Sequence, residues 1–192
     1  LVVAQVAVSL LLLVGAGLVS RSLDAAQRAD RGFVGDDVTA VEFDLKANGY
    51  DETRGRVFYT QLLDAARSAS GVEAASLAAE TPLSFLETRS QRVAIEGYQL
   101  QRGEDLSMLS NIVGPSYFKT LRVPVVAGRE FEDRDDRSAA PTAVVNRTLA
   151  ERFWGTAEAA IGKRIQIGNG DWRTVIGVAA DLKYVRINEA PR

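Results

Sequence analysis

The chain has 192 residues, of which 23 are basic and 25 acidic, and its formal net charge at pH 7 is −2. It contains no cysteine, which excludes disulfides and thiolate sites, and no histidine, which removes the commonest general base and transition-metal ligand. The balanced charge leaves no basic stripe for a phosphate backbone, so we expect no nucleic-acid partner.

The first twenty residues, LVVAQVAVSLLLLVGAGLVS, carry no charge and predict a transmembrane helix. About 20 apolar residues in a helix cross the roughly 30 Å hydrocarbon core of a bilayer. A short stalk is expected to follow, with Arg31-Gly32-Phe33 as the turn that ends it. A signal peptide is the alternative, because Gly15-Ala16-Gly17 resembles a cleavage site, but no basic segment precedes the run. We interpret the chain as a fragment that begins inside this helix and stops in mid-course.

The next segments predict a strand, a helix and a second strand. Residues 38–45 alternate apolar and polar side chains, as a half-buried strand does. Asp51 is the expected N-cap of a helix over residues 52–69, whose apolar side chains recur at spacings of three and four. Ser70-Gly71 ends this helix, and residues 72–79 form the second predicted strand. The result is a βαβ-like opening with a helix against one face of a sheet.

The rest of the chain predicts more short strands separated by turns and one further helix. The expected strands or extended segments cover residues 92–96, 106–113, 123–129, 143–146, 161–168 and 172–179. Asn169-Gly170 joins the last two in a hairpin. We also expect a helical turn at residues 115–118, and a helix around 149–154 capped by Asn146 or Thr148. The predicted fold class is α+β: a transmembrane helix and stalk (1–29), then a mixed α+β domain (30–192).

An acidic cluster stands in the charged segment 129–137, where oxygen ligands for Ca²⁺ are conceivable. Its members are Glu130, Glu132, Asp133, Asp135 and Asp136. The cluster lacks the ordered spacing and central glycine of an EF-hand loop, and three arginines compensate its charge. We therefore predict a solvated loop and no metal site.

Other motifs fall short of a catalytic or cofactor site. Gly162-Lys163 is followed by Arg164 and lacks the glycine that a Walker loop needs upstream. Ser116 is interpreted as a turn residue, and Asn146-Arg147-Thr148 matches a glycosylation sequon at a strand end. Ala16 and Ser20 have the small-x-x-x-small spacing that lets membrane helices approach, though lipid-facing helices often have it too. We predict no catalytic residue and no cofactor, and we expect no enzyme.

A series of short motifs also follows in a fixed order along the whole chain. The most specific stretch is Val113-x-Pro115-x-Tyr117-Phe118-x-Thr120-Leu121-x-Val123-Pro124, followed by Gly128-Arg129-x-Phe131. The shorter motifs are Arg21-Ser22-Leu23, Gly32-Phe33, Phe58-Tyr59-x-x-Leu62-Leu63, Gly71-Val72-Glu73, Thr81-Pro82-Leu83, Ala143-Val144-Val145-Asn146, Ile161-Gly162-Lys163-Arg164 and Trp172-x-Thr174-Val175-Ile176-Gly177-Val178. In this order they resemble bacterial permeases with a MacB-like periplasmic core domain.

The resemblance implies the permease half of an FtsX-like ABC transporter, similar to the acidobacterial type with duplicated permease units and no ATPase on the chain. It implies a bacterial inner-membrane location, with residues after about 30 extracytoplasmic. The implied partners are a separate ABC ATPase, transmembrane helices of the same or a second permease unit, and the lipid bilayer. ATP-driven motion of the helices would be relayed to the domain, which moves a substrate or partner outside the inner membrane.

Two other functions remain open from the residues alone. A membrane-anchored extracytoplasmic sensor or interaction module has the same outline of one helix and one α+β domain. A membrane-tethered hydrolase needs converging catalytic groups, for which Ser116 or the carboxylates of 130–136 are the available side chains.

Overall fold

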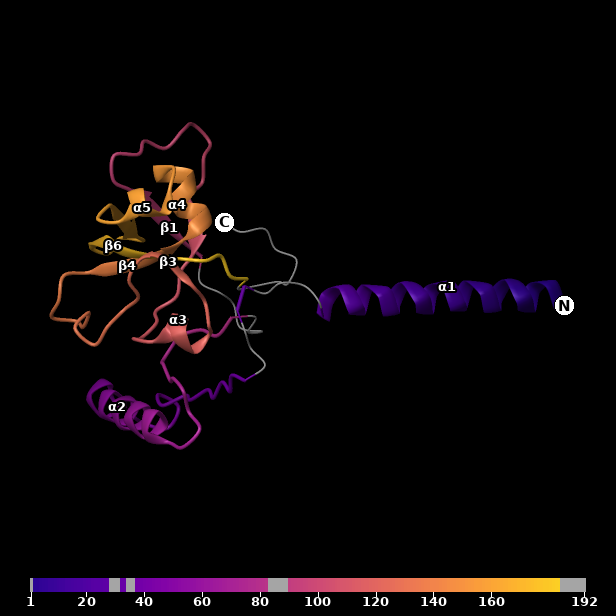
Figure 1. Cartoon of the computed structure of the whole chain (residues 1–192), viewed down its shortest axis with the longest axis horizontal. Coiled ribbons are helices and arrows are strands. Elements are labelled where there is room, and N and C mark those ends of the chain that lie inside the picture. The colour runs from indigo at the N-terminus through magenta and orange to yellow at the C-terminus, as the bar shows by residue number, and fades with distance from the viewer. Residues whose placement is uncertain (1, 28–31, 34–36, 83–89, 184–192) are drawn as a thin grey trace. The chain divides into compact units, whose positions relative to one another are not determined.

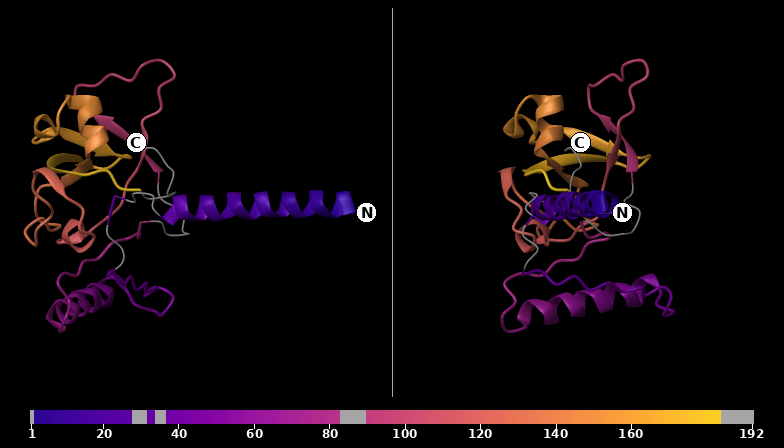
Figure 2. Two further views of the ribbon diagram at one scale, coloured as in Figure 1. Left: turned by 45° about the vertical axis from the view of Figure 1, so that its right-hand side comes forward. Right: turned by 90° about the vertical axis from the view of Figure 1, so that its right-hand side faces the viewer.

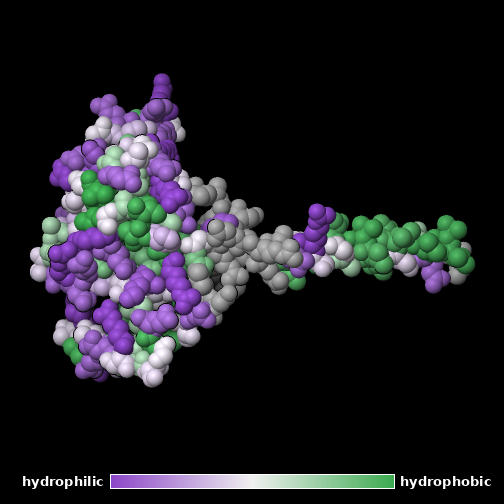
Figure 3. Space-filling model, viewed as in Figure 1, coloured by the Kyte–Doolittle hydropathy of each residue, from purple (hydrophilic) through white to green (hydrophobic). Residues whose placement is uncertain are grey.

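The computed structural model of the chain describes residues 2–27, 32–33, 37–82 and 90–183. Two compact units make up the chain, Leu1–Arg31 and Gly32–Arg192. The first contains one helix, α1 (Val2–Gln27), whose side chains are exposed from Val2 to Asp24. Figure 3 shows these side chains as a continuous apolar surface over most of the visible helix. The part from Val2 to Asp24 is long and apolar enough to cross a membrane, as the sequence predicted.

The second unit opens with an amphipathic helix, α2 (Glu52–Ser68), which Figure 1 draws apart from the sheet. Asp51 is its N-cap, because the Asp51 side chain accepts a hydrogen bond from the Arg54 backbone N–H at 2.8 Å. The Phe58 ring makes edge-to-face contacts with Phe43, Tyr50 and Tyr59. We call residues 37–82 the α2 lobe and residues 90–183 the sheet lobe.

The two strands predicted on either side of α2 do not form, so the prediction of a βαβ-like opening was wrong. Residues 38–44 carry no ladder, and residues 72–79 make only an isolated bridge, Ala78 to Val113. Alternating side chains are not sufficient for a strand, which also requires a neighbouring strand to bond with. The apolar positions of the first segment accordingly face outward, with Val41 67% and Phe43 40% exposed.

The sheet lobe is built on six short strands. They are β1 (Ser90–Ile95), β2 (Ser107–Leu109), β3 (Val125–Gly128), β4 (Thr142–Asn146), β5 (Arg164–Ile167) and β6 (Trp172–Ala179). Their order is β2-β1-β5-β6-β3, and β4 pairs with β6 in the one parallel ladder among the described strands. β5 and β6 form the predicted hairpin, with Gln166 opposite Trp172. β2 is shorter than the predicted segment 106–113.

Three short helices accompany the sheet: α3 (Tyr117–Thr120), α4 (Arg147–Trp154) and α5 (Ala157–Ala160). The sequence predicted α3 and α4 but not α5, whose four residues are too few for a periodic pattern. α4 and α5 pack on the sheet around Leu149, Ala150 and Ala160, against Val175 and Val178 of β6. A second apolar cluster joins α3 to the end of β6. The structure therefore confirms the α+β class.

Candidate functional site

The segment that follows α1 joins the second unit at Gly32. Its φ is +76°, a conformation that favours glycine. A β-carbon at Gly32 would overlap the carbonyl oxygen of Asp181 and lie 2.7 Å from the Leu182 α-carbon. Phe33 and Leu182 belong to the same apolar cluster. The start of the second unit is therefore packed tightly against the residues that leave β6.

The side chain of Asp181 binds the N-terminus of α4. One carboxylate oxygen accepts hydrogen bonds from the Asn146 side-chain amide at 2.7 Å and from the Thr148 backbone N–H at 3.0 Å. The other oxygen accepts from the Thr148 hydroxyl at 3.0 Å. Asn146 in turn caps α4, since its side chain accepts from the Leu149 backbone N–H at 3.3 Å. We call Gly32, Asn146, Thr148 and Asp181 the joint.

The other end of α4 holds the loop between β1 and β2, residues 96–106, which projects beyond the sheet in Figure 1. Arg152 of α4 forms an ion pair with Glu104 at 2.9 Å, and Phe153 stacks edge-to-face on Tyr98 with ring centroids 5.0 Å apart. The Tyr98 hydroxyl donates to Glu104 at 2.8 Å. The loop is thus fixed to α4 by one ion pair and one aromatic contact.

The carboxylate of Glu104 organises this loop internally. It accepts a hydrogen bond from the Gln101 backbone N–H at 3.1 Å, and this bond and the one from Tyr98 lower the pKa of Glu104. The same contact with Glu104 raises the pKa of the Tyr98 hydroxyl. Leu100, near the tip, remains 52% exposed. The loop is an ordered element that presents an apolar side chain to its surroundings.

The predicted charged loop 129–137 is held together by its own charges. Asp135, whose side chain is only 5% exposed, binds the Arg129 guanidinium at 2.5 and 2.8 Å. Its carboxylate also accepts from the Glu132 backbone N–H at 2.8 Å. The Arg129 hydrogen bonds lower the pKa of Asp135 to about 2 and raise the pKa of Arg129. Asp135 therefore serves as the internal anchor of the loop.

The other acidic residues of this loop point to separate partners. Glu132 pairs with Arg134 at 2.8 Å, and Asp133 lies 3.9 Å from Arg67 of α2. Asp136 accepts from the Ser138 and Ala139 backbones, while Glu130 accepts from the Lys119 N–H at 3.4 Å. Within the described ranges 2–27, 32–33, 37–82 and 90–183, no group of three or more acidic side chains is placed to hold a metal ion.

The remaining candidates have backbone roles. Ser116 precedes α3 with φ +64°, and its carbonyl accepts from Thr120, so it turns the chain as the sequence suggested. Gly162 lies in a turn with φ +82° and donates its N–H to Val175, while Lys163 is exposed. The structure does not bring these residues together. Asn146 and Thr148 meet at the joint, where sequence analysis gave them only a capping role.

A cleft of about 630 Å³ opens beside the sheet, between strands β1, β2, β4 and β5, helix α3 and the loop after Phe131. Its lining is largely apolar and includes Met108, Tyr117, Phe118 and Ile167. Asp135 and Asp136 also border it, but both carboxylates are engaged in the loop contacts already described. The lining therefore suits apolar contact better than proton transfer.

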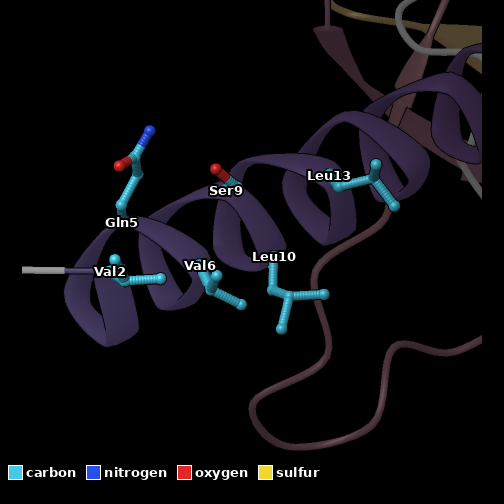
Figure 4. Close-up of a pocket in the computed structure, with 6 residues that line it drawn as sticks. All are labelled: Val2, Gln5, Val6, Ser9, Leu10 and Leu13. Atoms are coloured by element: carbon cyan, nitrogen blue, oxygen red, sulfur yellow. The ribbon is translucent and has the colours of Figure 1, made fainter.

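α1 has a shallow face rather than an enclosed pocket, and Figure 4 shows six side chains along it. Gln5 and Ser9 project to one side of the helix, four residues apart, while Val6 and Leu10 project to the other. Small or polar side chains on one face let membrane helices approach closely. The predicted pair Ala16 and Ser20 also lies on α1 and is exposed.

Sequence analysis missed Asp181 and Glu104 as organising residues. Each carboxylate acts on groups distant in the chain: Asp181 is 33 residues from Thr148, and Glu104 is 48 residues from Arg152. No local spacing rule covers such distances. The sequence did offer one signal. Asn146 can cap only part of the first turn of α4, so the Thr148 N–H and hydroxyl needed another acceptor, which is Asp181.

The family model described as the MacB-like periplasmic core domain matches residues 1–189. Among curated proteins, the chain is 28% identical over 122 residues to the probable syringafactin export ATP-binding/permease protein SyfD of Pseudomonas syringae pv. tomato. This match covers 64% of the chain and 18% of that protein. The chain thus spans less than a fifth of the length of this curated relative.

Two solved structures are similar in fold. The periplasmic region of MacB from Actinobacillus actinomycetemcomitans is 16% identical with a TM-score of 0.46, over 66% of this chain and 52% of that one. The extracellular domain of the ABC-type transporter YknZ from Gram-positive bacteria is 21% identical with a TM-score of 0.42, over 62% of this chain and 55% of that one.

Proposed function

The chain belongs to the MacB-like periplasmic core domain family of ABC transporter permeases, and from this membership we propose that its second unit couples movement of membrane helices to a substrate or partner outside the membrane. In this proposal α1 is the transmembrane helix and the sheet lobe is the moving body. The curated relative is named an export ATP-binding/permease protein, which supports a transport role.

The observation that carries the proposal is the way the chain enters its second unit. Gly32 lies five positions beyond Gln27, the last residue of α1, and its backbone is packed against Asp181 and Leu182. A displacement that reaches Gly32 is therefore passed to residues 181–182, because the two backbones lie in contact.

We propose the bacterial inner membrane as the location, with residues after about 30 extracytoplasmic and a functional division into 1–29 and 30–192. The proposed partners are an ABC ATPase, other transmembrane helices of the same or a second permease unit, and the bilayer around α1. α1 offers an exposed apolar surface to lipid and the face of Gln5 and Ser9 to another helix.

We further propose that the domain works mechanically and catalyses no reaction. The carboxylates of the charged loop serve in ion pairs and turn caps, as shown for Asp135 and Asp136. Ser116 serves the turn before α3. An active site needs reactive groups that converge on one point.

The proposal is tested by a distance measurement in the full-length permease, reconstituted with its ATPase in nanodiscs. These 192 residues contain no cysteine, so Ser22→Cys on α1 and Asn169→Cys in the β5–β6 turn take spin labels selectively once any cysteine elsewhere in the complex is replaced. We expect the label-to-label distance to change between the ATP-bound and nucleotide-free states. Equal distance distributions in both states would contradict the coupling role.

A matched control uses an ATPase whose Walker lysine is replaced, which should abolish the change. Orientation is tested separately by adding protease to spheroplasts. We expect the second unit to be cut from outside. Protection until lysis would contradict the extracytoplasmic placement. Any distance change would then describe a domain on the cytoplasmic side.

A further inference from the structure

We propose that Asp181 is a positioning residue that ties the segment arriving from α1 to helix α4, and that α4 passes displacement on to the β1–β2 loop. This inference rests on the proposed coupling function and assigns it a route through the sheet lobe. The route begins at Gly32, passes Asp181 and α4, and ends at Glu104 and Tyr98.

The first step is the backbone contact at Gly32. Because a β-carbon there would overlap the Asp181 carbonyl, the two backbones lie in direct contact. The Ala180 N–H donates to the Pro124 carbonyl at 2.8 Å, so the chain that leaves β6 is also bonded to the residue before β3. Gly32 therefore cannot move toward residues 181–182 without displacing them.

The second step is the carboxylate of Asp181, which takes three hydrogen bonds from two residues. Two of them come from Thr148, through its backbone N–H and its hydroxyl, and one from Asn146. Hydrogen bonds to a charged acceptor are shorter and stronger than those between neutral groups. They fix the first turn of α4 to the end of β6.

The third step runs along α4 itself, which has eight residues and measures about 12 Å at 1.5 Å per residue. Thr148 in its first turn and Arg152 in its last turn lie four residues apart, on one side of the helix. Arg152 and Phe153 hold Glu104 and Tyr98 of the β1–β2 loop. α4 is therefore bound to Asp181 at its first turn and to the β1–β2 loop at its last turn.

The end of the route is an exposed surface. Figure 2 shows the β1–β2 loop projecting from the sheet in both views, and Leu100 near its tip is 52% exposed. Displacing α4 would move this loop relative to the β5–β6 turn, which lies on the sheet. The joint thus links Gly32, through α4, to a loop with an exposed apolar side chain.

The test uses the full-length permease with its ATPase in nanodiscs and two label pairs. The pair Ser22→Cys and Asn169→Cys reports movement of α1 relative to the sheet lobe. The pair Arg102→Cys and Asn169→Cys reports movement of the β1–β2 loop relative to the sheet. In the unmodified background we expect both distances to shift between the ATP-bound and nucleotide-free states.

Asp181→Ala should abolish the ATP-dependent shift of the Arg102–Asn169 distance and leave the Ser22–Asn169 shift in place. Thr148→Val, which removes only the hydroxyl bond, should reduce the first shift and serves if Asp181→Ala does not fold. The matched control is Asp136→Asn, because Asp136 also caps backbone N–H groups but lies outside the joint. It should leave both shifts unchanged.

The outcomes separate the two proposals. If the Ser22–Asn169 distance shifts but the Arg102–Asn169 distance does not, or if both shifts persist in Asp181→Ala and Thr148→Val, the route through Asp181 is overturned while coupling stands. If the Ser22–Asn169 distance does not shift in the unmodified protein, the proposed coupling function is wrong, and the route through Asp181 is then wrong as well.

Discussion

Arg129 and Asp135 form a two-point ion pair that closes a single charged loop, with nitrogen–oxygen distances of 2.5 and 2.8 Å. Arg129 comes directly after β3, and its backbone N–H bonds to the Ile176 carbonyl of β6 at 3.0 Å. The loop is therefore tied to the centre of the sheet at one end and folded onto itself by the ion pair.

Replacing Asp135 with Asn should lower the free energy of unfolding by about 1–3 kcal/mol, because charge-assisted hydrogen bonds are lost and Arg129 keeps its charge. The measurement is urea unfolding in detergent micelles, followed by tryptophan fluorescence. Asp133→Asn is the matched control, since that side chain is 83% exposed and lies 3.9 Å from Arg67. We expect its effect to stay within about 0.5 kcal/mol. Equal effects of the two variants would contradict an anchoring role for Asp135.

The same carboxylate predicts how stability depends on pH. The folded-state pKa of Asp135 is lowered to about 2 from its ordinary value of 3.8, mainly by the Arg129 hydrogen bonds. A lowered folded pKa stabilises the protein above the unfolded pKa, and this contribution is lost as the pH falls from about 4 to 2. Asp135→Asn should therefore flatten the fall in stability over this range. An identical pH profile for the variant and the unmodified protein would contradict the assignment.

Gly177 in β6 permits a close approach of two backbones. A β-carbon there would overlap the carbonyl oxygen of Arg129, so Gly177→Ala must displace the start of the charged loop. We expect a loss of about 1–3 kcal/mol in the free energy of unfolding, as for other overpacked sites. Gly15→Ala, with nothing within 4 Å of its added carbon, is the control and should leave the sheet lobe unaffected. An unchanged unfolding midpoint for Gly177→Ala would refute this packing.

Gly55 lies in the first half of α2, and the opposite result is expected there. Its added β-carbon would meet only the Leu45 side chain, at an ordinary contact distance of 3.7 Å. Since glycine costs up to about 1 kcal/mol relative to alanine inside a helix, Gly55→Ala should stabilise α2 by about that amount. Hydrogen exchange of the α2 amides measures this directly. Faster exchange in the variant would show that Leu45 cannot accommodate the methyl group.

Local patterns were sufficient for several elements. The uncharged run of twenty residues predicted α1, Asp51 marked the start of α2, and Asn169-Gly170 marked the β5–β6 hairpin. In each case the determining interactions lie within a few residues of one another. Capping bonds, turn geometry and continuous apolar length are all properties of a short stretch of chain.

The strands expected at 38–45 and 72–79 failed because pairing depends on a neighbour that local alternation cannot supply. The joint was not predictable for the same reason, because its contacts join residues far apart in the sequence. Asp181 binds Thr148, 33 residues earlier in the chain, and Gly32 at the start of the second unit contacts Asp181 near its end. The sequence alone determined that this protein has an apolar helix and an α+β domain with no cysteine or histidine chemistry. Only the tertiary structure decided which carboxylate binds the first turn of α4 and which backbone Gly32 meets, since both contacts join residues far apart in the chain.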